Sequence, residues 1–103
     1  MHSVVINVKL KPGMRDQAVQ LWHEHLAEAD EANDDIVHLA LVTDDEDEDA
    51  LRLVEFYREP AGFDTVMTTP EVGAFVTATA DMMAAAPTFS RGTPVWTKAL
   101  GPT

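Results

Sequence analysis

The sequence contains no cysteine, and only seven of its 103 residues are lysine or arginine. Without cysteine the chain forms no disulfide, no thiolate metal site, no iron–sulfur cluster and no cysteine nucleophile. Against 18 aspartate and glutamate residues, the seven basic residues leave a net charge of −11, which repels phosphates and anionic lipid head groups. The sequence therefore predicts no nucleic-acid partner and no membrane partner.

Long apolar runs are also missing. No uninterrupted apolar stretch of about 20 residues is present, and residues 1–4 lack the basic and apolar regions of a secretory signal. We therefore expect a cytoplasmic protein. A length of 103 residues predicts one domain over 1–103, with a core small enough for self-association to matter to its stability.

Hydrophobic periodicity predicts secondary structure in the order β-α-β-β-α-β. The predicted strands are 4–10, 36–42, 51–57 and 94–100. A helix begins at Met14, and its apolar stripe includes Trp22 and His25. After a short helical piece near Phe63, Thr69 as a cap and Pro70 at the first helical position start the last helix.

Residues 44–49 are six consecutive acidic side chains with no cation among them. Their mutual repulsion predicts a solvated loop, and its position between two predicted strands makes it a long hairpin connection. The run lacks the glycine and the regular ligand spacing of a calcium loop.

Two β-α-β units in tandem predict an α+β, ferredoxin-like βαββαβ fold, with a four-stranded antiparallel sheet and both helices on one face. Strand 36–42 is almost wholly apolar, whereas a sheet with one wet face alternates apolar and polar residues. The face opposite the helices, with Val37, Leu39 and Leu41 or their opposite set, would then be an exposed apolar patch. A second copy of the chain, packed face to face, is the expected cover, which makes the protein a homodimer.

Three segments resemble the antibiotic biosynthesis monooxygenase family of dimeric α+β barrels. They are Lys11-Pro12-Gly13, the strand segment 54–59, and the broken helix from 63 to 75. The resemblance covers nearly the whole chain. It implies a homodimer through its sheet faces and one cleft per subunit between sheet and helices. Members include quinol and polyketide monooxygenases that use oxygen without metal or flavin, and haem-degrading relatives.

The same resemblance can be followed residue by residue. Glu55 matches the glutamate usual in the third strand, and Tyr57 stands where many members place tryptophan. Val66 replaces a residue that is histidine in many relatives and tryptophan in the haem degraders, and Val76 replaces the iron-ligating histidine of those degraders. The resemblance therefore implies no haem, and we expect no cofactor. In an ungapped alignment Ile6 rather than Asn7 takes the place of a functional asparagine, so Asn7 is expected to point elsewhere or to donate to an oxyanion.

Cofactor-free oxygenation requires a base that converts a phenol into an electron-rich anion inside a dry pocket. His38 is the predicted base because it interrupts an apolar strand and a histidine side chain ordinarily titrates near neutral pH. The alternative is a histidine satisfied locally or at the dimer contact. Tyr57 and Trp96 either stack on a planar substrate or fill the sheet surface. His23 and His25 lie two positions apart on a helix and cannot grip one metal ion, so no metal site is predicted.

The sequence thus predicts a cofactor-independent monooxygenase that oxidises a planar aromatic substrate of quinol or polyketide type. The alternative is a non-oxidative binding protein or isomerase on the same scaffold. The predicted catalytic residues are His38, Tyr57 and Asn7. The predicted substrate-binding residues are Trp22, His25, Val66, Phe75, Val76, Met83 and Trp96.

Overall fold

A computed structural model describes residues 1–98 and 101–102 of the chain. Its strands are β1 (His2–Lys9), β2 (Ile36–Thr43), β3 (Ala50–Tyr57), β4 (Thr88–Gly92), β5 (Trp96–Thr97) and β6 (Gly101–Pro102). Its helices are α1 (Arg15–Trp22), α2 (Glu28–Ala32), α3 (Pro60–Val66) and α4 (Pro70–Thr79), with a π-helical turn η1 (His23–Ala27) and a 3-10 turn η2 (Ala80–Met82). The first four strands and the helices follow the predicted order.

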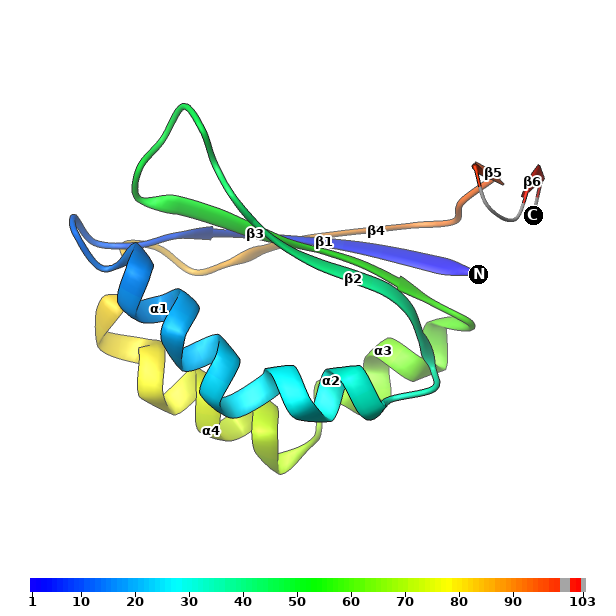
Figure 1. Cartoon of the computed structure of the whole chain (residues 1–103), viewed down its shortest axis with the longest axis horizontal. Coiled ribbons are helices and arrows are strands. Elements are labelled where there is room, and N and C mark those ends of the chain that lie inside the picture. Colours follow the sequence, from blue (N-terminus) through cyan, green and yellow to red (C-terminus); the bar gives the residue numbers. More distant parts are fainter. Residues whose placement is uncertain (99–100, 103) are drawn as a thin grey trace.

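The four long strands form one antiparallel sheet in the order β2-β3-β1-β4, and the helices lie on one face of it (Figure 1). This arrangement is the ferredoxin-like βαββαβ topology, so the predicted fold class is confirmed. Within the described residues every helix is too short or too polar to span a membrane.

Side-chain alternation along β1 and β3 builds the core. In β3, Leu51, Leu53, Glu55 and Tyr57 are buried, whereas the residues between them are only half-buried. The inward residues of β1, such as Val4 and Ile6, pack on the same side, and Phe63 of α3 closes over them. Because successive strand residues point to opposite faces, every second residue meets the helices and the others form the outer face of the sheet.

The first helical segment runs without a break from Arg15 to Ala32 through α1, η1 and α2. Ala18 and Leu26 are its buried residues. The second segment restarts at Pro70 as the sequence predicts, because the Thr69 hydroxyl accepts a hydrogen bond from the Val72 amide at 3.4 Å.

The last strand of the sheet differs from the prediction. The structure pairs β4 with β1, whereas the predicted strand 94–100 is not part of the sheet, and residues 99 and 100 lie outside the described residues. Instead, β5 pairs with β6 in a small separate sheet. The sequence 88–92 is a weak strand signal because every residue in it is exposed. Backbone pairing with β1 holds it in the sheet, together with the contacts of Phe89 to Phe63 and of Arg91 to His2 and Asp64.

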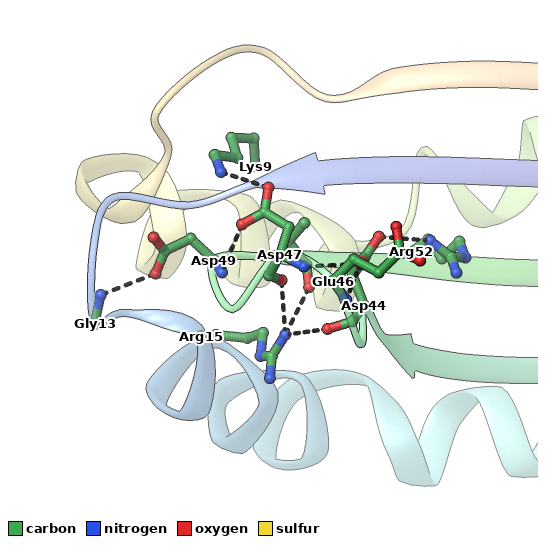
Figure 2. Close-up of polar contacts among 9 residues, drawn as sticks. Lys9, Gly13, Arg15, Asp44, Glu46, Asp47, Asp49 and Arg52 are labelled. Carbon is green, nitrogen blue, oxygen red and sulfur yellow. Dashed lines mark hydrogen bonds and ion pairs between the residues drawn. The ribbon is translucent and has the colours of Figure 1, made fainter.

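The acidic run 44–49 connects β2 to β3 as predicted, but cations from other segments organise it (Figure 2). Arg15 Nη1 donates to the backbone oxygens of Asp44, Asp47 and Ala50 at 2.9, 3.0 and 3.2 Å. Lys9 Nζ contacts the Asp47 carboxylate at 2.6 Å, and Arg52 contacts Asp44 at 3.2 Å.

Hydrogen bonding within the run also favours the ionised carboxylates. The Asp44 carboxylate accepts backbone N–H groups from Glu46 and Asp47, and these two bonds are the main cause of its lowered pKa. For Asp47, the hydrogen bond from Lys9 is the main cause of a lowered pKa. The loop is therefore more ordered than its charge alone suggests.

Candidate functional site

A cavity of about 200 Å³ lies between the helix-facing side of the sheet and the helices. Strand residues such as Ile6 and Leu53 form its floor, and residues of α1, α3 and α4 form its walls. The lining is apolar apart from a few groups, namely Asp30, Glu55, Tyr57, Thr79 and the indole of Trp22. No lysine, arginine or histidine is among the lining residues, so the described wall carries negative charge only.

Glu55 and Tyr57 form the polar part of the cavity floor. They stand two residues apart on β3, which puts both side chains on the helix-facing side. The Tyr57 hydroxyl donates to Glu55 Oε1 at 2.5 Å, and both residues are buried, with 0% and 5% of their surface exposed. Burial raises the pKa of Glu55, and the hydrogen bond from Tyr57 opposes part of that rise.

Tyr57 itself stays protonated throughout the physiological range. Burial and the neighbouring Glu55 raise the pKa of the Tyr57 hydroxyl well above its ordinary value. The hydroxyl is therefore a hydrogen-bond donor in this site and does not act as a base.

Asp30 brings a second carboxyl group to the same cavity from α2. The carboxylate makes no hydrogen bond or ion pair with any other described residue, and burial raises its pKa from 3.8 to about 6. The charge of Asp30 also raises the pKa of Glu55 and of Tyr57, so the three groups share one electrostatic environment. A carboxyl with a pKa near the working pH is suited to accept and return a proton.

Two further polar groups line the cavity without taking part in this cluster. The Trp22 indole Nε1 is buried and has no hydrogen-bond acceptor within the described residues, and the indole packs edge-on against the His23 ring. The Thr79 hydroxyl donates to the Phe75 backbone oxygen at 2.9 Å, so α4 satisfies it internally.

Residues 1–78 of this chain match the sequence model of a protein family described as antibiotic biosynthesis monooxygenase. The chain belongs to this family. Among curated proteins no sequence matches it significantly.

Solved structures that carry the family's name share the fold of the whole chain. One from Chloroflexus aurantiacus J-10-fl has a TM-score of 0.79 and 18% identity, and covers 97% of this chain and 98% of its own. One from Nitrosomonas europaea has a TM-score of 0.85 and 12% identity, with 93% and 100% covered. One from Caulobacter crescentus CB15 has a TM-score of 0.84 and 18% identity, with 91% and 89% covered. At these identities the likeness establishes the fold alone.

In this antibiotic biosynthesis monooxygenase fold, six of the residues that the sequence nominates for the site line the cavity. They are Trp22, Tyr57, Val66, Phe75, Val76 and Met83. Five of the six present apolar or aromatic surface, and Tyr57 adds the hydroxyl described above. Their roles toward a substrate stay predictions.

Four nominated residues lie elsewhere. His38 and Asn7 are exposed on the outer face of the sheet, because each pairs in register with an outward residue of β3, Phe56 and Arg52 respectively. His25 is half-buried on η1 but does not line the cavity. Trp96 is 63% exposed on β5, away from the sheet core.

The titratable groups that line the cavity are therefore Asp30, Glu55 and Tyr57, and His38 is not among the lining residues. From the sequence, Glu55 was identified only by resemblance and Asp30 was not nominated for the site. The available signal for Asp30 was its spacing: Trp22, Leu26 and Asp30 recur every four residues, and all three line the cavity. In the described part of the chain no three histidine, aspartate or glutamate side chains gather closely enough to hold a metal ion.

Proposed function

We propose that the protein is a monooxygenase that oxidises a small hydroxyl-bearing aromatic molecule with molecular oxygen, without metal or flavin. The observation that carries the proposal is the carboxyl pair Asp30 and Glu55, held with the Tyr57 hydroxyl in an otherwise apolar cavity. Membership of the antibiotic biosynthesis monooxygenase family supports the reaction class. The cavity of about 200 Å³ favours a single-ring quinol or phenol over a larger polyketide, because pockets for drug-sized ligands measure roughly 300 to 1,000 Å³.

The proposed chemistry begins with a proton transfer. Asp30 or Glu55, each with a raised pKa, takes the proton of the ring hydroxyl. The resulting phenolate gives electrons to oxygen, and a ring carbon that carries hydrogen, beside or opposite the hydroxyl, forms a bond to one oxygen atom. That atom stays on the ring as the second carbonyl of a quinone. The other oxygen atom leaves as water with the hydroxyl hydrogen and the ring hydrogen, so phenol plus oxygen gives quinone plus water.

The remaining lining suits this chemistry in two ways. The apolar wall excludes water from the reduced-oxygen intermediate, which prevents side reactions. Tyr57 keeps its proton, so its hydroxyl holds the Glu55 carboxylate in place and can donate a hydrogen bond to the substrate oxygen.

We further propose that two chains pair through the outer faces of their sheets. The helices cover only one face of the sheet (Figure 1), and the outer face carries half-buried apolar side chains such as Val5, Val54 and Phe56. Such a face is best covered by a second copy of the chain, and family membership supports the pairing. Sedimentation at micromolar concentration should show a dimer that Phe56→Lys dissociates. A wild-type monomer of 11.3 kDa would contradict the pairing.

The test of the enzyme claim is to load the protein with a hydroquinone without oxygen, then add oxygen and record oxygen uptake and quinone absorbance. We expect uptake equal to product formed, and losses of about 100-fold or more in Asp30→Asn and Glu55→Gln if both carboxyl groups share the base role. Glu31→Gln, an exposed neighbour on the same helix, is the matched control and should keep full activity.

The second candidate is a protein that binds or isomerises such a ligand without oxidising it. The aliphatic character of Val66 and Val76 in the cavity wall favours this alternative, because neither can orient an oxygen intermediate. Saturable binding with no oxygen uptake would establish it and remove the oxidase claim.

A further inference from the structure

The charge of the cavity points to a feature of the ligand that the proposed reaction does not require. Every titratable group that lines the cavity, namely Asp30, Glu55 and Tyr57, is acidic. We propose that the aromatic ligand carries a cationic amino group on a short side chain, and that Asp30 binds this group. The assignment rests on the proposed function only for the ring hydroxyl; the amino group follows from the cavity itself.

The first argument is that Asp30 lacks a partner, whereas Glu55 has one. Tyr57 donates to Glu55 at 2.5 Å, which leaves the Glu55 carboxylate partly satisfied. Asp30 faces the same cavity with no hydrogen bond or ion pair from the described residues. An unpaired carboxylate in an apolar wall is costly, and a ligand with a positive charge relieves that cost on binding.

The second argument is that the chain's arginines cannot serve as the counter-charge, because each is engaged elsewhere. Their partners are the acidic loop 44–49 for Arg15 and Arg52, the Asp34 backbone oxygen for Arg58, and His2 and Asp64 for Arg91. Lys9 is paired with Asp47 in that same loop. None of these side chains lines the cavity, and neither does Lys11 or Lys98, so no lysine or arginine of the chain neutralises Asp30 there.

The third argument concerns the aromatic walls. Trp22, Phe75 and Phe89 line the cavity together with Tyr57, and the negative faces of such rings attract an ammonium group. Aromatic walls also stack on the ring of the ligand. A ligand with a carboxylate or phosphate would instead meet two acidic groups and no cation, so the cavity should reject it.

The test compares three ligands that share a 4-hydroxyphenyl ring and differ at the end of a short side chain. Tyramine carries an ammonium group, tyrosol a neutral hydroxyl and 4-hydroxyphenylacetate a carboxylate. Binding is measured by calorimetry without oxygen at a pH above about 6, where Asp30 is ionised. We expect tyramine to bind about tenfold or more tightly than tyrosol, and 4-hydroxyphenylacetate to bind weakest.

The effects of pH and of the Asp30→Asn substitution test whether Asp30 causes the preference for tyramine. Lowering the pH through about 6 should weaken tyramine binding and leave tyrosol binding nearly unchanged, because only the ammonium ligand needs the ionised carboxylate. Asp30→Asn should abolish the tyramine preference while it retains tyrosol binding, which also shows that the variant is folded. Glu31→Gln, exposed on α2, should keep the preference.

The inference and the proposed function fail in different ways. Equal affinities for tyramine and tyrosol, no binding of either, or a preference that survives in Asp30→Asn would overturn the inference. Tight tyramine binding without oxygen uptake would leave the inference standing and remove the oxidase claim. Oxygen uptake with hydroquinone but no preference for the ammonium ligand would overturn the inference and leave the oxidase claim standing.

Discussion

The hydrogen bond between Tyr57 and Glu55 predicts an unusual pH dependence of stability. Tyr57→Phe removes the hydroxyl that donates to Glu55 Oε1 at 2.5 Å and leaves the ring in the core. A hydrogen bond to an ionised carboxylate contributes about 1.5 to 3 kcal/mol, so the removal should lower the free energy of unfolding by about that amount at any pH where Glu55 is ionised.

The sign of the pH dependence follows from the pKa of Glu55. Burial raises this pKa above 4.5, and the Tyr57 hydroxyl opposes the rise, so the substitution raises the pKa further. A carboxyl with a raised pKa in the folded state contributes stability that is full below pH 4.5 and is lost as the pH rises through the folded pKa. The cost of Tyr57→Phe should therefore be largest at neutral and alkaline pH and shrink as the pH falls toward 4.5.

Urea unfolding followed by circular dichroism at a series of pH values measures this cost. The second arm of a double-mutant cycle is Glu55→Gln, in which the pH dependence of the Tyr57→Phe cost should vanish. Thr79→Val is the control: it also deletes a buried hydroxyl, but one that donates to the Phe75 backbone oxygen, so its cost should not change with pH. A Tyr57→Phe cost that is the same at every pH would refute the reasoning.

Three further substitutions are tested by the same urea unfolding. Asp30→Asn should stabilise the protein by about 1 to 2 kcal/mol above pH 6, after allowance for partial solvent screening, because burial raises the pKa of Asp30 and the fold therefore disfavours its ionised form. The gain should disappear as the pH falls toward 3.8. A loss of stability above pH 6 would contradict this. Thr69→Ala should cost about 1 kcal/mol through the lost cap on the Val72 amide, and Thr69→Ser should restore most of it. Arg15→Gln should cost about 1 to 2 kcal/mol, because three backbone oxygens of the acidic loop lose their shared donor, and an unchanged midpoint would show that water replaces the guanidinium.

Most elements of the fold could be predicted because their signals are local. The alternation in residues 51–57 and the cap at Thr69 with Pro70 act within one strand or one helical turn, and the structure confirms both elements. The last strand could not be predicted, because its residues are exposed and the contacts that place it join residues far apart in the sequence: the pairing with β1 and the hydrogen bonds of Arg91 to His2 and Asp64. Val95 and Trp96 suggested a strand by composition, yet they are 78% and 63% exposed.

The candidate site divides in the same way. Tyr57 and the apolar lining residues could be nominated from periodicity and resemblance, and they line the cavity. His38 was nominated because histidine is unusual in an apolar strand, but the face on which it lies depends on the strand's register against β3. A shift of that register by one residue would have reversed the assignment.

By itself the sequence determined the order of strands and helices, the absence of thiol chemistry and the strong negative charge, because composition and periodicity are properties of neighbouring residues. Only the tertiary structure decided that Asp30 from one helix meets Glu55 and Tyr57 from a strand about 25 residues away, in a wall without a cation. The reason is physical: a raised pKa arises from burial and from charges close in space, and the folded chain alone brings these groups together.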